Sequence, residues 1–217
     1  GLILQHNLYG TEIDPRAGAL AVFALTMKAA AKRKLFLKNP VEPNICVLEP
    51  ISFTADELSY LVTGDGDRPA EEAFWNQFAQ ADTVGSLIKP EPGLTARLRR
   101  HLESLDDGGD MLRADTAQRA TRVLREAEFL TTRYAVVVAN PPYMGAKNMA
   151  SPLASFLKEA FKGLHGDLFS AFIERGAGFL LNGGMLGFMT PNVWMYISSH
   201  AATRRRLGSV VALRTLV

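Results

Sequence analysis

Tyr134-Ala-Val-Val-Val-Ala-Asn-Pro-Pro-Tyr143 is the stretch from which the fold can be inferred. Its first six residues are apolar and rich in β-branched side chains, and two prolines follow shortly after them. Such a run predicts a strand buried on both faces, as in the interior of a parallel sheet. Open α/β sheets bind their ligands at the carboxyl ends of such strands. We therefore expect an α/β fold with a binding site at Asn140-Pro141-Pro142-Tyr143.

This tetrapeptide has the groups needed to hold a planar amine. Asn140 and Pro141 each precede a proline, which favours extended conformations and stiffens the turn before anything binds. The Asn140 side-chain oxygen and the Pro141 carbonyl offer two acceptors for the two hydrogens of an NH2 group. Accepting both hydrogens draws the nitrogen lone pair out of conjugation, so that it can attack an electrophilic methyl group. Tyr143 adds a flat ring for stacking on a base. The structural alternative is a proline-rich turn with an incidental Asn and Tyr.

An Asn-Pro-Pro-Tyr sequence after an apolar strand resembles the catalytic motif of the adenine-specific DNA methyltransferases that act on the exocyclic amine. The resemblance implies a Rossmann-like class I methyltransferase core, S-adenosylmethionine as the cofactor, and a target adenine flipped out of double-stranded DNA. It assigns catalytic roles to Asn140, Pro141, Pro142 and Tyr143. Residues 7–27 and 81–88, together with the Asn-Pro-Pro-Tyr block, are similar to the methyltransferases of BREX phage-defence systems. Other phage-defence proteins are therefore expected partners.

The stretch from Asn7 to Ala31 predicts a strand followed by a helix. Asp14 suits the helix N-cap and Pro15 the first helical position, and apolar residues recur at helical spacing at Leu20, Ala24, Met27 and Ala31. Glu12 is left at the end of the strand, where an acidic residue accepts hydrogen bonds from the cofactor ribose in dinucleotide-type folds. Residues 10–17 resemble the second methyltransferase motif, in which this glutamate holds the ribose. A solvated carboxylate is the alternative for Glu12, and capping alone explains Asp14.

Two further residues are candidates for contact with the cofactor. Residues 44–49 predict the next strand, and the family places an acidic residue at its end to bind the amino group of the cofactor's adenine. Glu49 holds that position here, although the common residue is Asp and Pro50 follows directly; a loop carboxylate is an equal alternative. Phe169, in an Asp-Leu-Phe sequence that the family places near the cofactor, is a candidate for stacking on the adenine. A core aromatic is the alternative.

Residues 63–133 differ in character from the stretches on either side. Turn-forming clusters at 64–67 and 106–109, and a helix boundary at residues 90–92, divide this stretch into helical patterns at 74–87, 94–105 and 117–129. We interpret this as a helical insertion between two sheet strands, as in the large methyltransferases of combined restriction and modification enzymes, which it resembles. Its arginines, among them Arg97, Arg99 and Arg100, either contact DNA phosphates or form a solvated face.

The end of the chain predicts more α/β structure. Asp167 suits the N-cap of an apolar helix that we expect to stop at Asn182-Gly-Gly184. Residues 185–189 predict a buried strand beside residues 134–139, and residues 210–217 predict another.

The loop after residue 189 begins Thr190-Pro191-Asn192, and the resemblance implies that it forms the wall of the target-base pocket, with Trp194 and Tyr196 as candidate lining residues. Three arginines, residues 204–206, suit the end of a helix because the dipole favours cations there. Contact with DNA phosphates is the functional alternative.

Composition sets broad limits. The chain has 217 residues, a formal charge of +2 and a pI near 8.7, which permits nucleic-acid binding without requiring it. The single cysteine, Cys46, cannot form an internal disulfide, and its apolar setting suggests a buried thiol in the cytoplasm. No apolar run approaches the length of a membrane span. The histidines share no metal-ligand spacing with each other or with Cys46, so no metal site is expected.

We divide the chain into a cofactor-side part of the core (1–62), the helical insertion (63–133) and the catalytic part (134–217). The family's first motif, a strand followed by a glycine-rich turn, is not recognisable, and we expect it upstream of Gly1, with a target-recognition domain beyond Val217. Such a fragment should be marginally stable and should bind the cofactor weakly. Two other functions remain open: a protein-glutamine methyltransferase, since the motif also suits a carboxamide, and a non-catalytic DNA-binding module.

Overall fold

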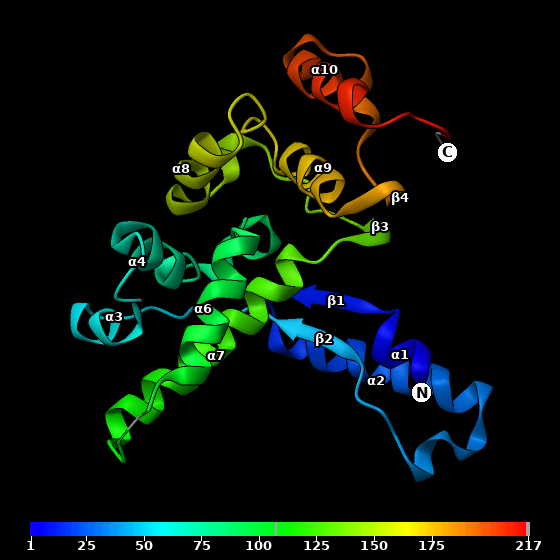
Figure 1. Cartoon of the computed structure of the whole chain (residues 1–217). Helices are drawn as coiled ribbons and strands as arrows, with labels where there is room; N and C mark the ends of the chain where they lie inside the picture. The colour runs from blue at the N-terminus through cyan, green and yellow to red at the C-terminus, as the bar shows by residue number, and fades with distance from the viewer. Residues whose placement is uncertain (107, 216–217) are drawn as a thin grey trace. The chain divides into compact units, whose positions relative to one another are not determined.

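The computed structural model describes residues 1–106 and 108–215, and Figure 1 traces them from the amino terminus to the carboxyl terminus. The described residues combine helices with short parallel sheets, as expected for an α/β protein. They form two compact units, Gly1–Thr131 and Thr132–Val217. Among the described helices, none combines the length and the apolar character that crossing a membrane requires.

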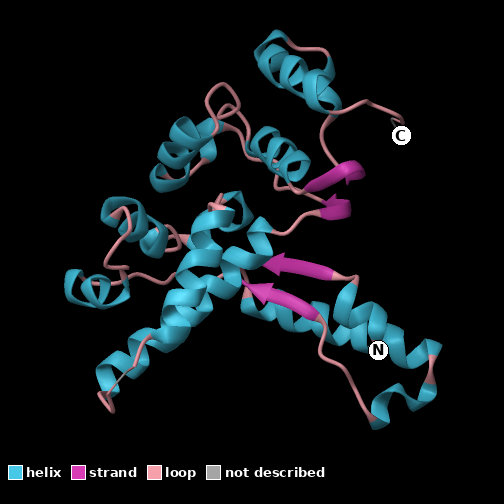
Figure 2. Cartoon of the chain, in the orientation of Figure 1, coloured by secondary structure: helices cyan, strands magenta, loops and turns pink. Residues whose placement is uncertain are grey.

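The first unit begins with a two-stranded parallel sheet. Strand β1 (Tyr9–Glu12) follows α1 (Leu2–His6) and pairs with β2 (Asn44–Val47), with Tyr9 opposite Asn44 and Glu12 opposite Val47. Helix α2 (Pro15–Lys32) and the short 3-10 helix η1 (Lys34–Lys38) connect the strands, as Figure 2 shows. The Asp14 carboxylate accepts a hydrogen bond from the Arg16 N–H, so the predicted cap is confirmed.

Helix α2 meets the sheet through a different face from the apolar stripe identified in the sequence. Leu20 and Met27 of that stripe are 67% and 49% exposed, whereas Gly18 is buried. A Cβ atom on Gly18 would lie 2.7 Å from a methyl carbon of Val47. The glycine therefore lets the helix backbone approach the strand closely.

Helices make up the rest of the first unit. They are α3 (Ala55–Leu61), α4 (Arg68–Asn76), α5 (Ala81–Val84), η2 (Gly85–Leu87), α6 (Pro92–Ser104) and α7 (Met111–Thr131). Helix α6 packs along α7, and the buried side chains of this region include Trp75, Phe78, Leu98 and Leu124. The predicted helical character of residues 63–133 is thus confirmed.

The second unit contains another parallel pair. Strand β3 (Tyr134–Ala139) lies beside β4 (Leu180–Phe188), with Val137 opposite Leu186 and Ala139 opposite Phe188. The predicted neighbour relationship between these strands is therefore confirmed. The other elements are η3 (Ala146–Asn148), α8 (Ser151–Ala160), α9 (Leu168–Gly178), η4 (Asn192–Met195), η5 (Ser198–His200) and α10 (Ala201–Val210).

The burial expected for β3 was wrong for one of its faces. Val136 and Val138 are 53% and 75% exposed, while the intervening Val137 is partly covered. Successive side chains of a strand point to opposite faces, so the Val136 and Val138 side chains share the uncovered face. Helix α9 covers β4, where a Cβ atom on Gly176 would lie 2.5 Å from the Phe188 ring.

Three predicted boundaries in the second unit also need correction. Helix α9 ends at Gly178, and residues 182–184 lie inside β4, where Gly183 has φ +78° and the pairing register with β3 shifts. The left-handed glycine thus shapes an irregular strand instead of ending a helix. Helix α10 continues to Val210, so residues 204–206 do not lie in its last turn. Residues 211–215 form no strand; positions 216 and 217 of the predicted strand lie outside the described residues.

Candidate active site

The Asn140–Tyr143 loop follows directly from the end of β3. Asn140 is exposed, Pro141 is buried, and the Tyr143 ring is 55% exposed. The Tyr143 hydroxyl donates a long hydrogen bond of 3.4 Å to the Asn140 side-chain oxygen. The carboxamide and the ring therefore lie next to each other on the surface of the second unit, where an amine and its attached base could meet both.

Backbone hydrogen bonds hold this loop at each end. The Met189 N–H donates to the Ala139 carbonyl at 3.1 Å, which extends the β3–β4 ladder to the edge of the loop. Beyond the loop, the Leu168 N–H donates to the Met144 carbonyl at 2.9 Å, and Gly145 bridges to Asp167. Because its ends are fixed, the loop can present its acceptors with little reorganisation during a reaction.

Asp167, at the start of α9, is the first of three polar residues in contact, followed by His200 and Ser170. It occupies the N-cap position, but its carboxylate contacts His200 Nε2 at 3.2 Å and makes no cap hydrogen bond, contrary to the expected capping role. On the other side of the ring, His200 Nδ1 lies 3.4 Å from the Ser170 hydroxyl. Ser170 is only 1% exposed, so this Asp-His-Ser arrangement offers no accessible nucleophile and is structural.

Phe169 lies in the same buried layer. Its side chain is 2% exposed, and its ring centroid lies 5.4 Å from that of His200. Stacking on an adenine requires an accessible ring face, which a buried ring does not offer. The structure therefore favours the core role that the sequence left open as the alternative.

The loop that begins at Thr190 is fixed by an arginine. Trp194 donates from its indole N–H to the Thr190 hydroxyl at 3.2 Å. The Arg204 Nη1 group donates to the carbonyls of Trp194 and Ile197, at 2.7 and 2.8 Å. Tyr196, by contrast, is 70% exposed, so it can meet a ligand without rearrangement.

In the first unit, Glu12 and Glu49 follow the ends of paired strands. The ladder continues past the strand ends through the Leu48 N–H, which donates to the Glu12 carbonyl at 2.8 Å. The Glu12 Oε1 atom accepts from the N–H groups of Ile13 and Asp14, at 2.8 and 3.2 Å. No described residue donates to its Oε2 atom, so the side chain is oriented and still has a free acceptor.

Glu49 is held by two residues of α7. Its backbone N–H donates to Glu126 Oε1 at 3.1 Å, and its Oε2 atom pairs with Arg122 Nη1 at 3.3 Å. No described residue donates to the Oε1 atom of Glu49. Burial raises the pKa of Glu126 to about 8, so this carboxyl group is mostly protonated at neutral pH.

Glu126 and Arg122 were not identified from the sequence. The buried face of α7 includes Val123, Ala127 and Leu130, and Glu126 lies three residues after the first of these. A carboxyl group at a buried position of an apolar helical pattern is a detectable sign of a specific role, because burying an acid without a partner is costly. No feature of the sequence at Arg122 indicates a specific role in the same way.

Most of the arginines considered for DNA contact are engaged within the protein. Arg97 binds Thr63 and Asp65, both at 2.8 Å, and Arg99 pairs with Glu128. In α10, Arg206 pairs with Glu174 at 2.7 Å, and Arg204 holds the loop described above. Within the described part of the chain, Arg100 and Arg205 donate only to carbonyls of their own helices, so their side chains are better placed to meet phosphate.

Cys46 is buried, as expected. Burial raises the pKa of its thiol to about 12, with Glu126 and Glu49 adding to the effect, so the thiol is unreactive at neutral pH. Among residues 1–106 and 108–215, no cluster of three or more His, Cys, Asp or Glu side chains is arranged to hold a metal ion.

Comparison with known proteins identifies the family of the chain. The model of the family described as Eco57I restriction-modification methylase matches residues 6–217. The adenine-specific methyltransferase BrxX of Escherichia coli O9:H4 (strain HS) is 30% identical over an alignment of 229 residues, which covers 94% of this chain and 19% of that protein. The adenine-specific methyltransferase PglX of Lacticaseibacillus casei (strain Zhang) is 28% identical over 214 residues, covering 95% of this chain and 18% of that protein. The chain thus spans about a fifth of the length of these relatives.

Proposed function

Because the chain belongs to the Eco57I restriction-modification methylase family, we propose that it carries the catalytic loop and part of the cofactor site of a DNA adenine methyltransferase of phage defence. The reaction is transfer of a methyl group from S-adenosylmethionine to the exocyclic amine of an adenine flipped out of double-stranded DNA. The observation that supports this most directly is the exposed Asn140–Tyr143 loop, fixed at the carboxyl end of a parallel strand.

In this proposal the loop orients the attacking nitrogen. The Asn140 side-chain oxygen and the Pro141 carbonyl accept the two amine hydrogens, and Tyr143 stacks on the base. Pro142 stiffens the turn, because a proline restricts the residue before it. The nitrogen lone pair forms the new N–C bond as the C–S bond to the donor breaks, and one amine proton leaves to solvent. When bound, S-adenosylmethionine supplies a methyl group on a positively charged sulfur, and positioning accounts for most of the rate enhancement.

The first unit would bind the adenosine part of the cofactor. The free Oε2 atom of Glu12 suits a ribose hydroxyl, which donates a hydrogen bond to a carboxylate. The free Oε1 atom of Glu49 suits the amino group of the cofactor's adenine. These free acceptors are the features of the chain that fit the cofactor.

We further propose that β1–β2 and β3–β4 each belong to a Rossmann-like methyltransferase core, and that residues 63–133 are a helical insertion in that core. Both pairs are parallel, and in each a polar candidate residue follows the carboxyl end of a strand. Ligands of Rossmann-like sheets bind at that end. Residues 1–62 and 134–217 would then be the cofactor-side and catalytic parts of the core.

The test is transfer of labelled methyl groups from S-adenosylmethionine by the full-length protein to two acceptors, unmethylated DNA and a glutamine-containing release-factor peptide. We expect label only in DNA, recovered as methylated adenine. Label in the peptide would instead establish a protein-glutamine methyltransferase, because a carboxamide NH2 can occupy the same two acceptors. DNA binding without transfer to either acceptor would favour a non-catalytic module.

A further inference from the structure

The loop that follows β2, residues 49–53, is held almost entirely by the helical part of the first unit. Arg119, Arg122 and Glu126 are spaced three and four residues apart on α7, so they share one face of that helix. Glu126 accepts from the Glu49 N–H at 3.1 Å, and Arg122 pairs with the Glu49 carboxylate at 3.3 Å. Arg119 reaches further along the loop and donates to the Ser52 carbonyl at 3.0 Å.

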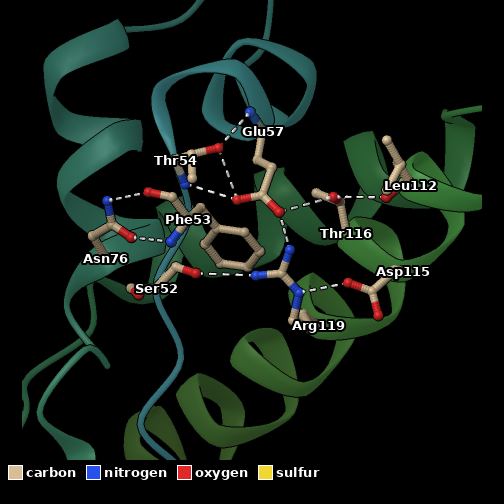
Figure 3. A network of polar contacts seen from close by, with 9 residues as sticks. All are labelled: Ser52, Phe53, Thr54, Glu57, Asn76, Leu112, Asp115, Thr116 and Arg119. Carbon is tan, nitrogen blue, oxygen red and sulfur yellow. Dashed lines mark hydrogen bonds and ion pairs between the residues drawn. The ribbon is translucent and has the colours of Figure 1, made fainter.

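Figure 3 shows how Arg119 is itself fixed. Its Nε group donates to Asp115 at 2.9 Å, its Nη2 group pairs with Glu57, and its guanidinium carbon lies 5.0 Å from the centre of the Phe53 ring. A guanidinium group with several partners in one plane loses little freedom when it forms another bond. Arg119 is therefore a rigid support for the loop.

Helix α4 completes the attachment at the far end of the loop. The Asn76 carboxamide accepts from the Phe53 N–H at 2.7 Å and donates to the Phe53 carbonyl at 3.2 Å, as Figure 3 also shows. In the middle of the loop, the Ile51 N–H donates to the Phe78 carbonyl at 3.2 Å. The backbone of residues 49–53 thus takes its conformation from partners in residues 76–126.

Glu126 makes this arrangement unusual. Its side chain is 3% exposed, and its Oε2 atom has no hydrogen-bond partner among the described residues. Burying a carboxyl group with half of its hydrogen-bonding capacity unused costs stability. An amide or an apolar side chain would be less costly if filling space were the only requirement.

We infer that one face of α7, formed by Arg119, Arg122 and Glu126, positions the loop after β2 for binding the adenine of the cofactor. The inference rests on the proposed function of Glu49. Glu126 sets the position of the Glu49 backbone, and Arg122 engages Oε2 so that Oε1 is left for the adenine amino group. The Glu49 side chain is long enough to reach Arg122, with which its Oε2 atom pairs at 3.3 Å. The helical insertion is then part of the cofactor site.

The experiment compares matched variants of α7 in the full-length protein. Arg122→Met and Glu126→Leu remove one contact each with Glu49. Arg125→Met is the control, because Arg125 is exposed on the same helix and bonds to no described residue of the loop. Affinity for S-adenosylmethionine is measured by calorimetry, DNA affinity by fluorescence anisotropy, and folding by thermal unfolding. We expect Arg122→Met and Glu126→Leu to weaken cofactor binding about three- to tenfold, with DNA affinity unchanged and Arg125→Met like wild type.

Cofactor affinities of Arg122→Met and Glu126→Leu equal to that of Arg125→Met would overturn the inference. Arg122 is 53% exposed, so its variant should fold even if Glu126→Leu does not. Glu12→Gln and Glu49→Gln test the proposed cofactor site separately from the positioning role of α7. Weaker cofactor binding in these variants, without any effect of the α7 changes, would refute the positioning role and leave the proposed function standing. If neither Glu12→Gln nor Glu49→Gln changes the affinity for S-adenosylmethionine, the proposed cofactor site is refuted, and the positioning role of α7 is refuted with it.

Discussion

At the scale of single residues, Tyr143 offers the proposed catalytic loop two groups whose contributions can be measured separately, its hydroxyl and its ring. Its hydroxyl donates to the Asn140 side-chain oxygen over 3.4 Å, which is too long for a strong hydrogen bond, while its ring is 55% exposed. We expect Tyr143→Phe to keep kcat/KM for DNA within about threefold of wild type. Tyr143→Ala should lower it by about 10- to 100-fold, because base stacking on an aromatic ring contributes roughly 1–3 kcal/mol. Equal losses in both variants, measured by methyl transfer, would show that the hydroxyl carries the role.

The raised pKa of Glu126 predicts how the free energy of unfolding depends on pH. Burial raises its pKa in the folded protein to about 8, whereas the pKa of an unfolded glutamate is about 4.3. Between these values the folded protein keeps a proton that the unfolded chain has released, so raising the pH lowers the free energy of unfolding. Relative to wild type, Glu126→Gln should therefore gain stability as the pH rises from about 5 to about 8, and no further gain should follow above that.

Chemical denaturation across this pH range measures the effect. The control is Glu103→Gln on α6, because Glu103 is exposed and has no partner among the described residues. The stability difference between this variant and wild type should not depend on pH. A flat difference for Glu126→Gln as well would mean that Glu126 is already ionised in the folded protein.

At the scale of elements, Arg204 fixes the loop before α10. It donates to the carbonyls of Trp194 and Ile197, whereas its neighbour Arg205 donates only weakly within the helix. We expect Arg204→Met to lower the free energy of unfolding by roughly 1–3 kcal/mol, because two carbonyls lose a charged donor. Arg205→Met should unfold like wild type. Thermal unfolding of the two variants side by side provides the measurement, and equal melting temperatures would contradict the structural role of Arg204.

Local patterns in the sequence predicted the helices and strands better than they predicted which of their side chains are buried and how distant segments pack together. The strand at 134–139 and the helix after Asp14 follow from apolar periodicity and capping residues, which act over a few residues. The pairing of β3 with β4 was expected from the usual strand order of the fold instead. The uncovered Val138, the strand geometry at Gly183 and the length of α10 depend on contacts between distant segments, which periodicity does not contain.

The same limit applied to the candidate site. The Asn140–Tyr143 loop and Glu12 could be identified because motif and strand end coincide in the sequence. The link from Glu126 to Glu49 joins residues 77 positions apart, so no local pattern could show it. The roles proposed for the individual site residues stay predictions until variants are measured.

At the scale of the whole molecule, apolar side chains remain uncovered in both units. Leu20 and Phe23 of α2 are 67% and 62% exposed, and Val138 of β3 is 75% exposed. Exposed apolar surface of this kind is expected to lower solubility and favour association.

The central claim is that Asn140 orients the amine of the target adenine for methyl transfer. The most direct test is single-turnover methylation of DNA by the full-length protein and its Asn140→Ala variant, with cofactor and DNA affinities measured in parallel. We predict that the variant binds both ligands about as well as wild type and transfers methyl groups at least ~100-fold more slowly. The reason is that the side-chain oxygen that accepts one amine hydrogen in the transition state is lost. An unchanged transfer rate in a folded, ligand-bound variant would contradict the proposed mechanism.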